Sequence, residues 1–321
     1  MKKLLLCATI AVAMCFASCE GFDTSEILDR LDNLENQFDD LKNNEENNQG
    51  GDNSDNQGGG DSGNEDSADN NKIYYTTSDN TKLFPKTDAS LYGAILISNT
   101  YKDGQGVLTF DDSVTSIGDS AFQDCTSLTS VTIPDSVISI GGSAFGSCTS
   151  LTSVTIGNSV TSIGDQAFYS CTSLTSITIP DSVTSIGEYT FFYCRSLISV
   201  TIGNSVTSIG YCAFEYCNSL TSITIPDSVT SIGDFAFRGC TSLTSVTIPD
   251  SVTSIGNWAF YDCTSLTEVY CKPTTPPTSG SGALPINNAS LIIYVPTDSV
   301  DAYKAKDGWK DYADYIKPYN F

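Results

Sequence analysis

Cysteine is the residue type whose spacing most invites chemistry in this chain. Seven cysteines recur every 23 residues, at Cys125, Cys148, Cys171, Cys194, Cys217, Cys240 and Cys263. In a parallel stack, equivalent positions lie about 5 Å apart, which a disulfide tolerates. Each repeat holds only one such cysteine, however, and free cysteine is among the most buried side chains. We predict a ladder of buried thiols and no metal site. Cys212 lies in a variable column instead, and we expect its thiol to be exposed and reactive.

Acid and base catalysis has little support in the sequence. The chain contains no histidine, so the commonest general base and transition-metal ligand is absent. The repeats offer scattered acids in the column after the repeat glycine, where a solvated turn is the simpler explanation: Asp119, Asp165, Glu188 and Asp234. We therefore predict a protein that is not an enzyme and needs no cofactor.

Charge is distributed unevenly along the chain. The formal net charge is −23, and residues 20–72 carry 16 acidic and 3 basic side chains. Within the repeats the only basic residues are Arg195 and Arg238. Without a basic stripe to neutralise phosphates, nucleic acid is not expected as a partner.

Aromatic residues occupy the columns that vary between repeats. Scaffold positions stay constant, so recognition is expected in the variable slots between Gly and Ala-Phe and between Phe and Cys. Rigid surface aromatics often dominate binding energy, which predicts a contact strip on the turn side of repeats 3–7. The alternative is that these rings fold back over neighbouring turns. The candidate ligand-binding residues are Tyr169, Tyr189, Phe192, Tyr193, Tyr211, Tyr216, Phe235, Trp258 and Tyr261.

A 23-residue repeat must position these side chains. Seven copies of a phrase close to S-V-T-S-I-G-x-x-A-F-x-x-C-T-S-L-T-S-V-T-I run through residues 113–270 without insertion or deletion. Alternating apolar and Ser/Thr residues indicate a strand packed on one face, and the A-F-x-x-C segment suggests one helical turn. A period in the twenties predicts a leucine-rich-repeat solenoid of short parallel β-strands and short helical turns, in which each unit stacks on its neighbours.

The flanking segments are expected to cap both ends of the stack. Residues 73–112 form the N-terminal cap, in which 107–110 align with the repeat register and add one strand. Residues 271–321 form the C-terminal cap. There, prolines from Pro273 to Pro277 are expected to stop the register before a last strand and a short amphipathic helix close the edge.

The pattern of the first 72 residues predicts an export signal followed by a tether. Residues 1–18 have two lysines, an apolar run and small residues before Cys19, the layout of a lipoprotein signal peptide. Residues 19–42 carry an a/d seam from Ile27 to Leu41, which either self-associates into a homo-oligomer or forms a transient helix. Residues 43–72 are almost devoid of apolar side chains and predict a disordered linker.

The repeat phrase I-G-x-x-A-F-x-x-C-x-x-L-x-x-V-x-I-P closely resembles the BspA-like leucine-rich repeat family of bacterial surface lipoproteins. The C-terminal segment, with Tyr294-Val295-Pro296 and Gly308-Trp309, is similar to the family's usual ending. The resemblance implies an acylated Cys19, a bacterium of the Bacteroides type and a non-enzymatic role outside the cell.

On this resemblance the expected partners are a host matrix or cell-surface protein, another cell or a glycan. The membrane is contacted through the lipid anchor only. An outer-membrane lipoprotein, at the cell surface, is the expected location, and the periplasmic face stays open. The alternatives are a structural or oligomer-forming envelope lipoprotein and a glycan-capture component of an uptake system.

Overall fold

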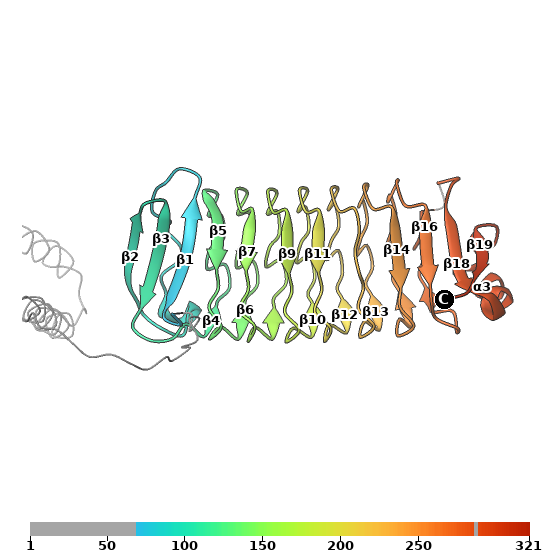
Figure 1. Ribbon diagram of the computed structural model, residues 1–321, viewed down its shortest axis with the longest axis horizontal. Helices are drawn as coiled ribbons and strands as arrows, with labels where there is room; N and C mark the ends of the chain where they lie inside the picture. The colour runs from blue at the N-terminus through green and yellow to red at the C-terminus, as the bar shows by residue number, and fades with distance from the viewer. Residues whose placement is uncertain (1–68, 286–287) are drawn as a thin grey trace, which may run out of the picture. The chain divides into compact units, whose positions relative to one another are not determined.

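The computed structural model describes residues 69–285 and 288–321, and these build a solenoid in which each repeat makes one turn (Figure 1). The signal peptide, Cys19, the Ile27–Leu41 seam and nearly all of the linker lie outside the described residues. No helix in the described part of the chain is both long and apolar enough to cross a bilayer. The expected repeat solenoid is confirmed.

One side of the solenoid is a column of strands that run parallel and in register. Serines of successive repeats lie opposite each other, as in Ser130 and Ser153, because the repeat length is constant; at the last repeat Ser245 lies opposite Glu268. In one repeat a single bridge from Thr224 to Thr247 replaces the strand. The strands are β5 (Leu128–Thr132), β7 (Ser153–Thr155), β9 (Ser176–Thr178), β11 (Ser199–Thr201), β14 (Ser245–Ile248), β16 (Glu268–Cys271), β18 (Ile292–Pro296) and β19 (Ile316–Tyr319).

A second column consists of two-residue strands, one in each turn. Paired strands are parallel, and isoleucine lies opposite isoleucine, as in Ile186 and Ile209. The isoleucine side chains point into the core and the preceding serines are more exposed. The strands are β4 (Ser116–Ile117), β6 (Ser139–Ile140), β8 (Ser162–Ile163), β10 (Ser185–Ile186), β12 (Ser208–Ile209), β13 (Ser231–Ile232), β15 (Ser254–Ile255) and β17 (Thr278–Ser279).

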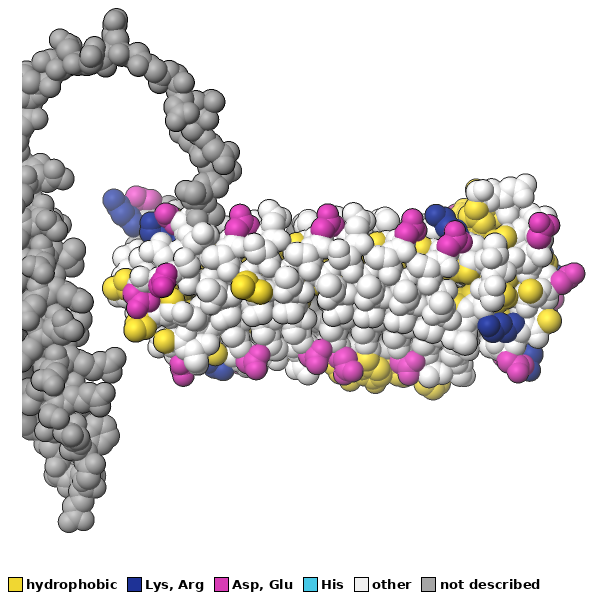
Figure 2. Space-filling view, turned by 90° about the horizontal axis from the view of Figure 1, so that it is seen from below, with side chains coloured by type: hydrophobic (Ala, Val, Ile, Leu, Met, Phe, Trp, Pro, Cys, Tyr) yellow, Lys and Arg dark blue, Asp and Glu magenta, His cyan; other side chains and the backbone are white. Residues whose placement is uncertain are grey.

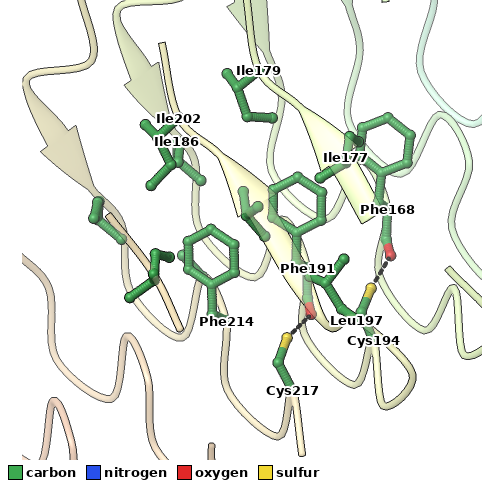
Figure 3. Packing of buried hydrophobic residues seen from close by; sticks show 14 of the residues in the cluster. Phe168, Ile177, Ile179, Ile186, Phe191, Cys194, Leu197, Ile202, Phe214 and Cys217 are labelled. Atoms are coloured by element: carbon green, nitrogen blue, oxygen red, sulfur yellow. Dashed lines mark hydrogen bonds between the residues drawn. The ribbon is translucent and has the colours of Figure 1, made fainter. Parts of the chain in front are cut away.

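The core between the columns contains a ladder of phenylalanine rings. The rings from Phe122 to Phe260 are fully buried, and consecutive centroids lie 5.0–5.5 Å apart with nearly parallel planes. Figure 3 shows Phe168, Phe191 and Phe214 in this arrangement. Burial of each ring contributes about 2–3 kcal/mol, so stacking repeats supply the stability that one repeat lacks.

The predicted thiol ladder is confirmed beside these rings. From Cys148 to Cys263, each thiol of the column is free and buried, whereas Cys125 at the first repeat is partly exposed. Each buried thiol donates to the phenylalanine carbonyl oxygen of the preceding repeat, as from Cys194 Sγ to Phe168 O at 3.2 Å (Figure 3). The column therefore ties successive turns together.

The expected helical turn between the columns does not form, since no helix lies within residues 113–270. Two successive turns replace it, and each contains one residue with positive φ. In the first repeat these are Ser120 and Asp124, with φ of 56° and 59°. A left-handed residue in each turn lets the chain reverse direction within the rise of one repeat, about 4.8 Å.

The N-terminal cap differs from expectation in its strand order. Strand β3 (Gln105–Phe110) does not pair with β5, because β1 (Lys72–Thr77) lies between them and is antiparallel to both. Strand β2 (Leu96–Lys102) pairs with the other edge of β3, after the short helix η1 (Ala89–Leu91). Only β2 and β3 are joined by a short turn, at Asp103 and Gly104, and together with β1 they form a three-stranded antiparallel unit that covers the end of the stack.

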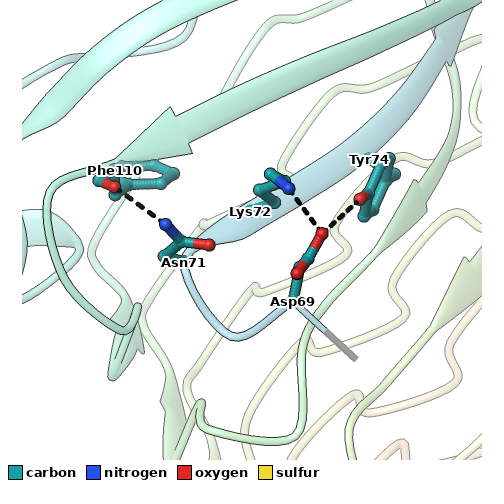
Figure 4. Close-up of polar contacts among 5 residues, drawn as sticks. All are labelled: Asp69, Asn71, Lys72, Tyr74 and Phe110. Carbon is teal, nitrogen blue, oxygen red and sulfur yellow. Dashed lines mark hydrogen bonds and ion pairs between the residues drawn. The ribbon is translucent and has the colours of Figure 1, made fainter. Parts of the chain in front are cut away.

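Polar contacts fasten the start of β1 to this cap (Figure 4). The Asp69 carboxylate accepts hydrogen bonds from Lys72 and from the Tyr74 hydroxyl group. The Asn71 side-chain amide donates to the Phe110 carbonyl oxygen at 3.3 Å. The Asn71 contact joins the start of β1 to β3, and the Asp69 contacts fix the chain just before β1.

The C-terminal prolines do not stop the register, contrary to expectation. Strand β17 pairs with β15, and β18 pairs with β16, at a spacing one residue longer than the repeat. The proline segment is held by buried donors: Tyr303 Oη donates to the Pro273 carbonyl and Trp309 Nε1 to the Pro277 carbonyl, both at 2.8 Å. Because proline lacks an N–H but keeps its carbonyl, it remains compatible with the stack.

Three short helices and β19 complete this end. The helices are η2 (Thr297–Ser299), α3 (Val300–Ala305) and η3 (Lys310–Tyr312). The expected amphipathic helix is therefore shorter than predicted, and Ile316 begins strand β19 instead. Pro318 lies in this edge strand, where a missing N–H hinders pairing with another chain.

Candidate functional site

The structure brings all nine sequence-predicted aromatic residues into one connected surface, here called the aromatic strip. Tyr169 stacks on Phe192 at 5.6 Å between centroids. From Phe192 the ring contacts continue on two routes, through Tyr193 to Tyr216 and through Tyr189 and Tyr211 to Phe235 and Trp258. Tyr261 joins through Arg238, which lies over both Phe235 and Tyr261. The ligand-binding role of these residues stays a prediction.

The strip is partly exposed. The two interpretations drawn from the sequence, a contact surface and rings that fold over neighbouring turns, therefore each apply to some of its rings. Tyr169, Trp258 and Tyr261 are 36–40% exposed, and the other six rings are half-buried against each other. Figure 2 shows hydrophobic side chains gathered at the lower edge of the solenoid over the later repeats, with acidic side chains beside them. The rings fold over neighbouring turns, and yet they form one outward-facing surface.

Five rings of the strip stand on left-handed backbone. Tyr189, Tyr193, Tyr216, Phe235 and Trp258 have φ between 51° and 61°. This conformation costs an L-residue about 1–2 kcal/mol, and bulky side chains rarely adopt it. The first two repeats place small or polar residues in the same conformation: Ser120, Asp124, Ser143 and Ser147. The fold needs the left-handed turn but does not need an aromatic ring there.

Glycine makes room for two of these rings. A Cβ atom at Gly239, where φ is 71°, would lie 2.7 Å from Tyr216 Cδ1. A Cβ atom at Gly282, where φ is 60°, would lie 2.8 Å from Trp258 Cδ1. Each ring therefore lies over a glycine of the following turn, and close packing fixes its orientation.

Both arginines of the repeats lie on the strip. The Arg195 guanidinium is 4.8 Å from the Tyr193 ring centroid, and Arg238 is 5.6 Å from that of Tyr216. Arg238 also pairs with the buried Glu215 at 3.1 Å between Nη1 and Oε1. Sequence analysis used the arginines only to exclude nucleic acid. Arg238 shares a variable column with Tyr169 and Tyr261, and this was the signal that could have placed it here; Arg195, which follows Cys194, lies outside those columns.

Cys212 is not exposed or poised for reaction, contrary to expectation. Its side chain is 3% exposed. Burial, followed by its hydrogen bond with Glu215, raises the pKa of the Cys212 thiol to about 12. Because the thiolate is the reactive species, this cysteine is inert near neutral pH. A variable column does not guarantee exposure when the neighbouring rings close over it.

The acids after the repeat glycine support the scaffold. Asp119 Oδ1 accepts a hydrogen bond from the Gly142 backbone N–H at 2.6 Å. Asp165 and Asp234 accept equivalent bonds from Glu188 and Asn257 at 2.7 Å. These carboxylates thus link adjacent turns. Within residues 69–285 and 288–321, no group of three His, Cys, Asp or Glu side chains is arranged to hold a metal ion.

A cleft of about 520 Å³ opens at the C-terminal end of the strip. Trp258 and Tyr261 form one side, and Asp311 and Tyr312 of the C-terminal cap contribute to the other. A smaller hollow of about 260 Å³ is lined by the same two rings with Phe235 and Arg238. Sequence analysis missed the cleft, because its cap residues lie far along the chain from the repeat that faces them.

Comparison with known proteins agrees with the repeat. Residues 103–221 and 211–284 match the model of the BspA type leucine rich repeat region, in six copies. A leucine-rich repeat protein from Bacteroides ovatus is 28% identical, with a TM-score of 0.42 over 61% of each chain. This chain thus spans about three fifths of the length of that protein.

Two further solved structures are similar. The T. pallidum leucine rich repeat protein is 30% identical over 58% of this chain and 81% of its own, with a TM-score of 0.43. A leucine rich cell surface protein from Faecalibacterium prausnitzii is 25% identical over 69% of this chain and 86% of its own, with a TM-score of 0.29. No curated protein matches. Since the family model matches more than half of the sequence, the chain belongs to the BspA-type leucine-rich repeat family.

Proposed function

We propose that this protein is a lipid-anchored binding module of the bacterial surface whose solenoid holds a ligand on the aromatic strip. The ligand is a host matrix or cell-surface protein, another cell or a glycan. The observation that carries the proposal is the placement of five aromatic rings on left-handed backbone. Bulky side chains rarely adopt this conformation, and residues held in such strained conformations cluster at binding and active sites.

The energetics favour recognition over packing as the reason for the strip. Repeats 1 and 2 make the same turns with small and polar residues, so the rings are not required for the fold. A rigid scaffold presents aromatic side chains with few torsions left to order, which lowers the entropic cost of binding. Aromatic and arginine side chains also supply most hot-spot energy at interfaces, and the strip combines both types.

The lipid anchor at Cys19 and the acidic linker fit this role. A linker of about 30 residues with a single alanine and no other apolar side chain would be expected to extend several nanometres on average. That reach would hold the solenoid away from the outer membrane. Replacement of Cys19 by alanine should release the protein from membranes into the soluble fraction, as followed by immunoblot.

The location is tested by treating intact cells with a protease that cannot cross the outer membrane. Digestion of the solenoid, with a periplasmic protein preserved as control, is the expected result. Protection would contradict surface binding. It would favour the structural alternative, in which the seam from Ile27 to Leu41 forms oligomers and the solenoid is a spacer.

Binding is tested with immobilised host matrix proteins and a glycan array. The matched variants replace Tyr193 and Tyr216 by serine, the residue that the column uses at Ser147 and Ser170. Loss of the bound partner, with the melting temperature little changed, is the expected result. Unchanged binding in a folded double variant would contradict a role for the strip.

A further inference from the structure

The C-terminal end of the strip has the features of a specific binding pocket. Trp258 and Tyr261 are each 40% exposed and line both the 520 Å³ cleft and the 260 Å³ hollow beside it. The larger volume falls in the range of small-molecule sites. Elsewhere along the strip, the rings mainly cover one another.

The Trp258 ring is held firmly in place. It stacks on Phe235 with centroids 5.2 Å apart and planes 23° from parallel, and its edge lies over Gly282, where a Cβ atom would collide with it. The backbone N–H of Trp258 donates to the Ser281 carbonyl at 2.9 Å. A fixed ring that remains partly exposed provides a flat stacking platform without a further ordering cost.

Polar groups without protein partners surround this platform. The exposed carboxylates of Asp262 and Asp311 both line the cleft. In the described part of the chain, neither carboxylate accepts a hydrogen bond or forms a close ion pair, and the Trp258 indole N–H has no acceptor. The neighbouring Lys310 interacts electrostatically with Asp311 but forms its close ion pair with Asp307. The floor is apolar and fixed, because Leu284 and Tyr312 are buried and the Leu284 N–H donates to the Tyr312 hydroxyl oxygen at 3.1 Å.

We propose that this cleft binds a sugar ring of a neutral glycan, a conclusion that rests on the proposed binding function of the strip. The apolar C–H face of a pyranose stacks on Trp258 or Tyr261. Its hydroxyl groups donate to the carboxylates of Asp262 and Asp311, and a ring or hydroxyl oxygen accepts from the indole N–H. The pocket thus matches the two-sided character of a sugar, apolar on its faces and polar around its edge.

The charge of the cleft narrows the ligand class. Two unpaired carboxylates at the rim disfavour sulfated, sialylated or uronate sugars, because like charges repel at short distance. A peptide that binds as an added strand needs unpaired backbone groups at a sheet edge, and none of the residues that line this cleft belongs to a β-strand. A neutral glycan satisfies both the rings and the carboxylates.

The two tryptophans of the chain provide a direct assay. Trp309 is fully buried, whereas Trp258 is exposed, so acrylamide should quench Trp258 selectively. Soluble neutral oligosaccharides of glucose, mannose, xylose and N-acetylglucosamine are titrated into the full chain, with sulfated and uronate oligosaccharides as controls. We expect at least one neutral oligosaccharide to protect Trp258 from quenching, and the acidic ones to have no effect.

Matched variants from the chain's own columns test the site by calorimetry. Trp258→Ser copies Ser120 and Ser143, and Tyr261→Gln copies Gln123. Each should weaken oligosaccharide binding by about tenfold or more, the scale of a hot-spot truncation. Ile198→Thr copies Thr175 at an exposed position outside the strip and should leave oligosaccharide affinity unchanged.

The outcomes separate the two proposals. If no neutral oligosaccharide binds, or if the folded Trp258→Ser variant binds as the wild type does, the sugar site is wrong. The sugar site can fail while the double variant Tyr193→Ser/Tyr216→Ser loses binding of a surface partner. That result would keep the function of the strip and reject only the assignment of the cleft. If none of these variants changes binding of any partner, both proposals fail.

Discussion

Two rows of aromatic rings run along this solenoid in neighbouring columns, and they obey different rules. The inner row, the phenylalanine ladder, has one ring in each of the seven repeats, all fully buried and nearly parallel. The outer row, the aromatic strip, begins only at Tyr169. Its rings meet at varied angles, from 4° to 78°, and several stand on left-handed backbone.

The difference separates what the scaffold requires from what it carries. Repeats 1 and 2 contribute Phe122 and Phe145 to the ladder but contribute nothing to the strip, and their turns have the same left-handed residues. The stacking of repeats therefore requires the ladder but does not require the strip. Each prediction below measures one side of this contrast.

The largest effect is expected in the ladder. Phe191→Ala should lower the free energy of unfolding by about 3–5 kcal/mol, because a buried ring is lost between two stacked neighbours. Its chain neighbour in the strip offers a matched control, since Phe192→Gln copies Gln123 and should cost about 1 kcal/mol. Urea unfolding followed by circular dichroism measures both. Similar losses in the two variants would remove the distinction between the rows.

The thiol column should make the protein sensitive to alkali. Burial raises the pKa of Cys194 from 9.0 to about 12. Its stabilising contribution is therefore complete below pH 9 and decreases as pH rises from 9 toward 12, because only the unfolded thiol ionises there. The loss is about 1.4 kcal/mol per pH unit for each such thiol.

The measurement compares urea unfolding at pH 7.5 and pH 10 under reducing conditions. Cys194→Ser keeps a donor for the Phe168 carbonyl but does not titrate. Its decrease in stability between the two pH values should be smaller than that of the wild type by about 1.4 kcal/mol. An equal decrease would show that this thiol does not contribute.

A smaller effect on stability is expected from the left-handed backbone under the strip, and the test is which of two variants is the more stable. Glycine normally destabilises a folded protein relative to alanine, but at Tyr193, where φ is 61°, the order should reverse. Tyr193→Gly should be more stable than Tyr193→Ala by about 1 kcal/mol, because only glycine adopts left-handed backbone without strain. Thermal and urea unfolding of the pair test this, and an alanine variant at least as stable would argue against the turn geometry.

The smallest expected effect is a difference in the rate of thiol labelling. Iodoacetamide at pH 8 should modify Cys125 first among the described thiols, since it is partly exposed and burial raises its pKa only to about 11. Cys212 should remain unmodified in the folded protein despite its place among the strip columns. Peptide mass mapping distinguishes them, and early modification of Cys212 would mean that the rings over it open readily.

Much of the scaffold could be predicted because each repeat contacts mainly the repeats directly before and after it. The constant spacing of Ile186 and Ile209 implied parallel pairing in register, and the single cysteine that each repeat contributes to the column implied free thiols. The strip residues could also be identified, since aromatics such as Tyr193 and Tyr216 occupy variable columns. The prediction of a helical turn was wrong because A-F-x-x-C spacing does not reveal which residues adopt positive φ.

By itself, the sequence determined the solenoid, its repeat length, its buried ladders and the variable columns that hold the aromatic strip. Tertiary structure alone decided the insertion of β1 between β3 and β5, the burial of Cys212 and the cleft between Trp258 and Asp311. The reason is physical: contacts inside the stack repeat with the sequence, so periodicity encodes them. Contacts with the caps occur once, between segments distant in the chain, and only the folded arrangement brings them together.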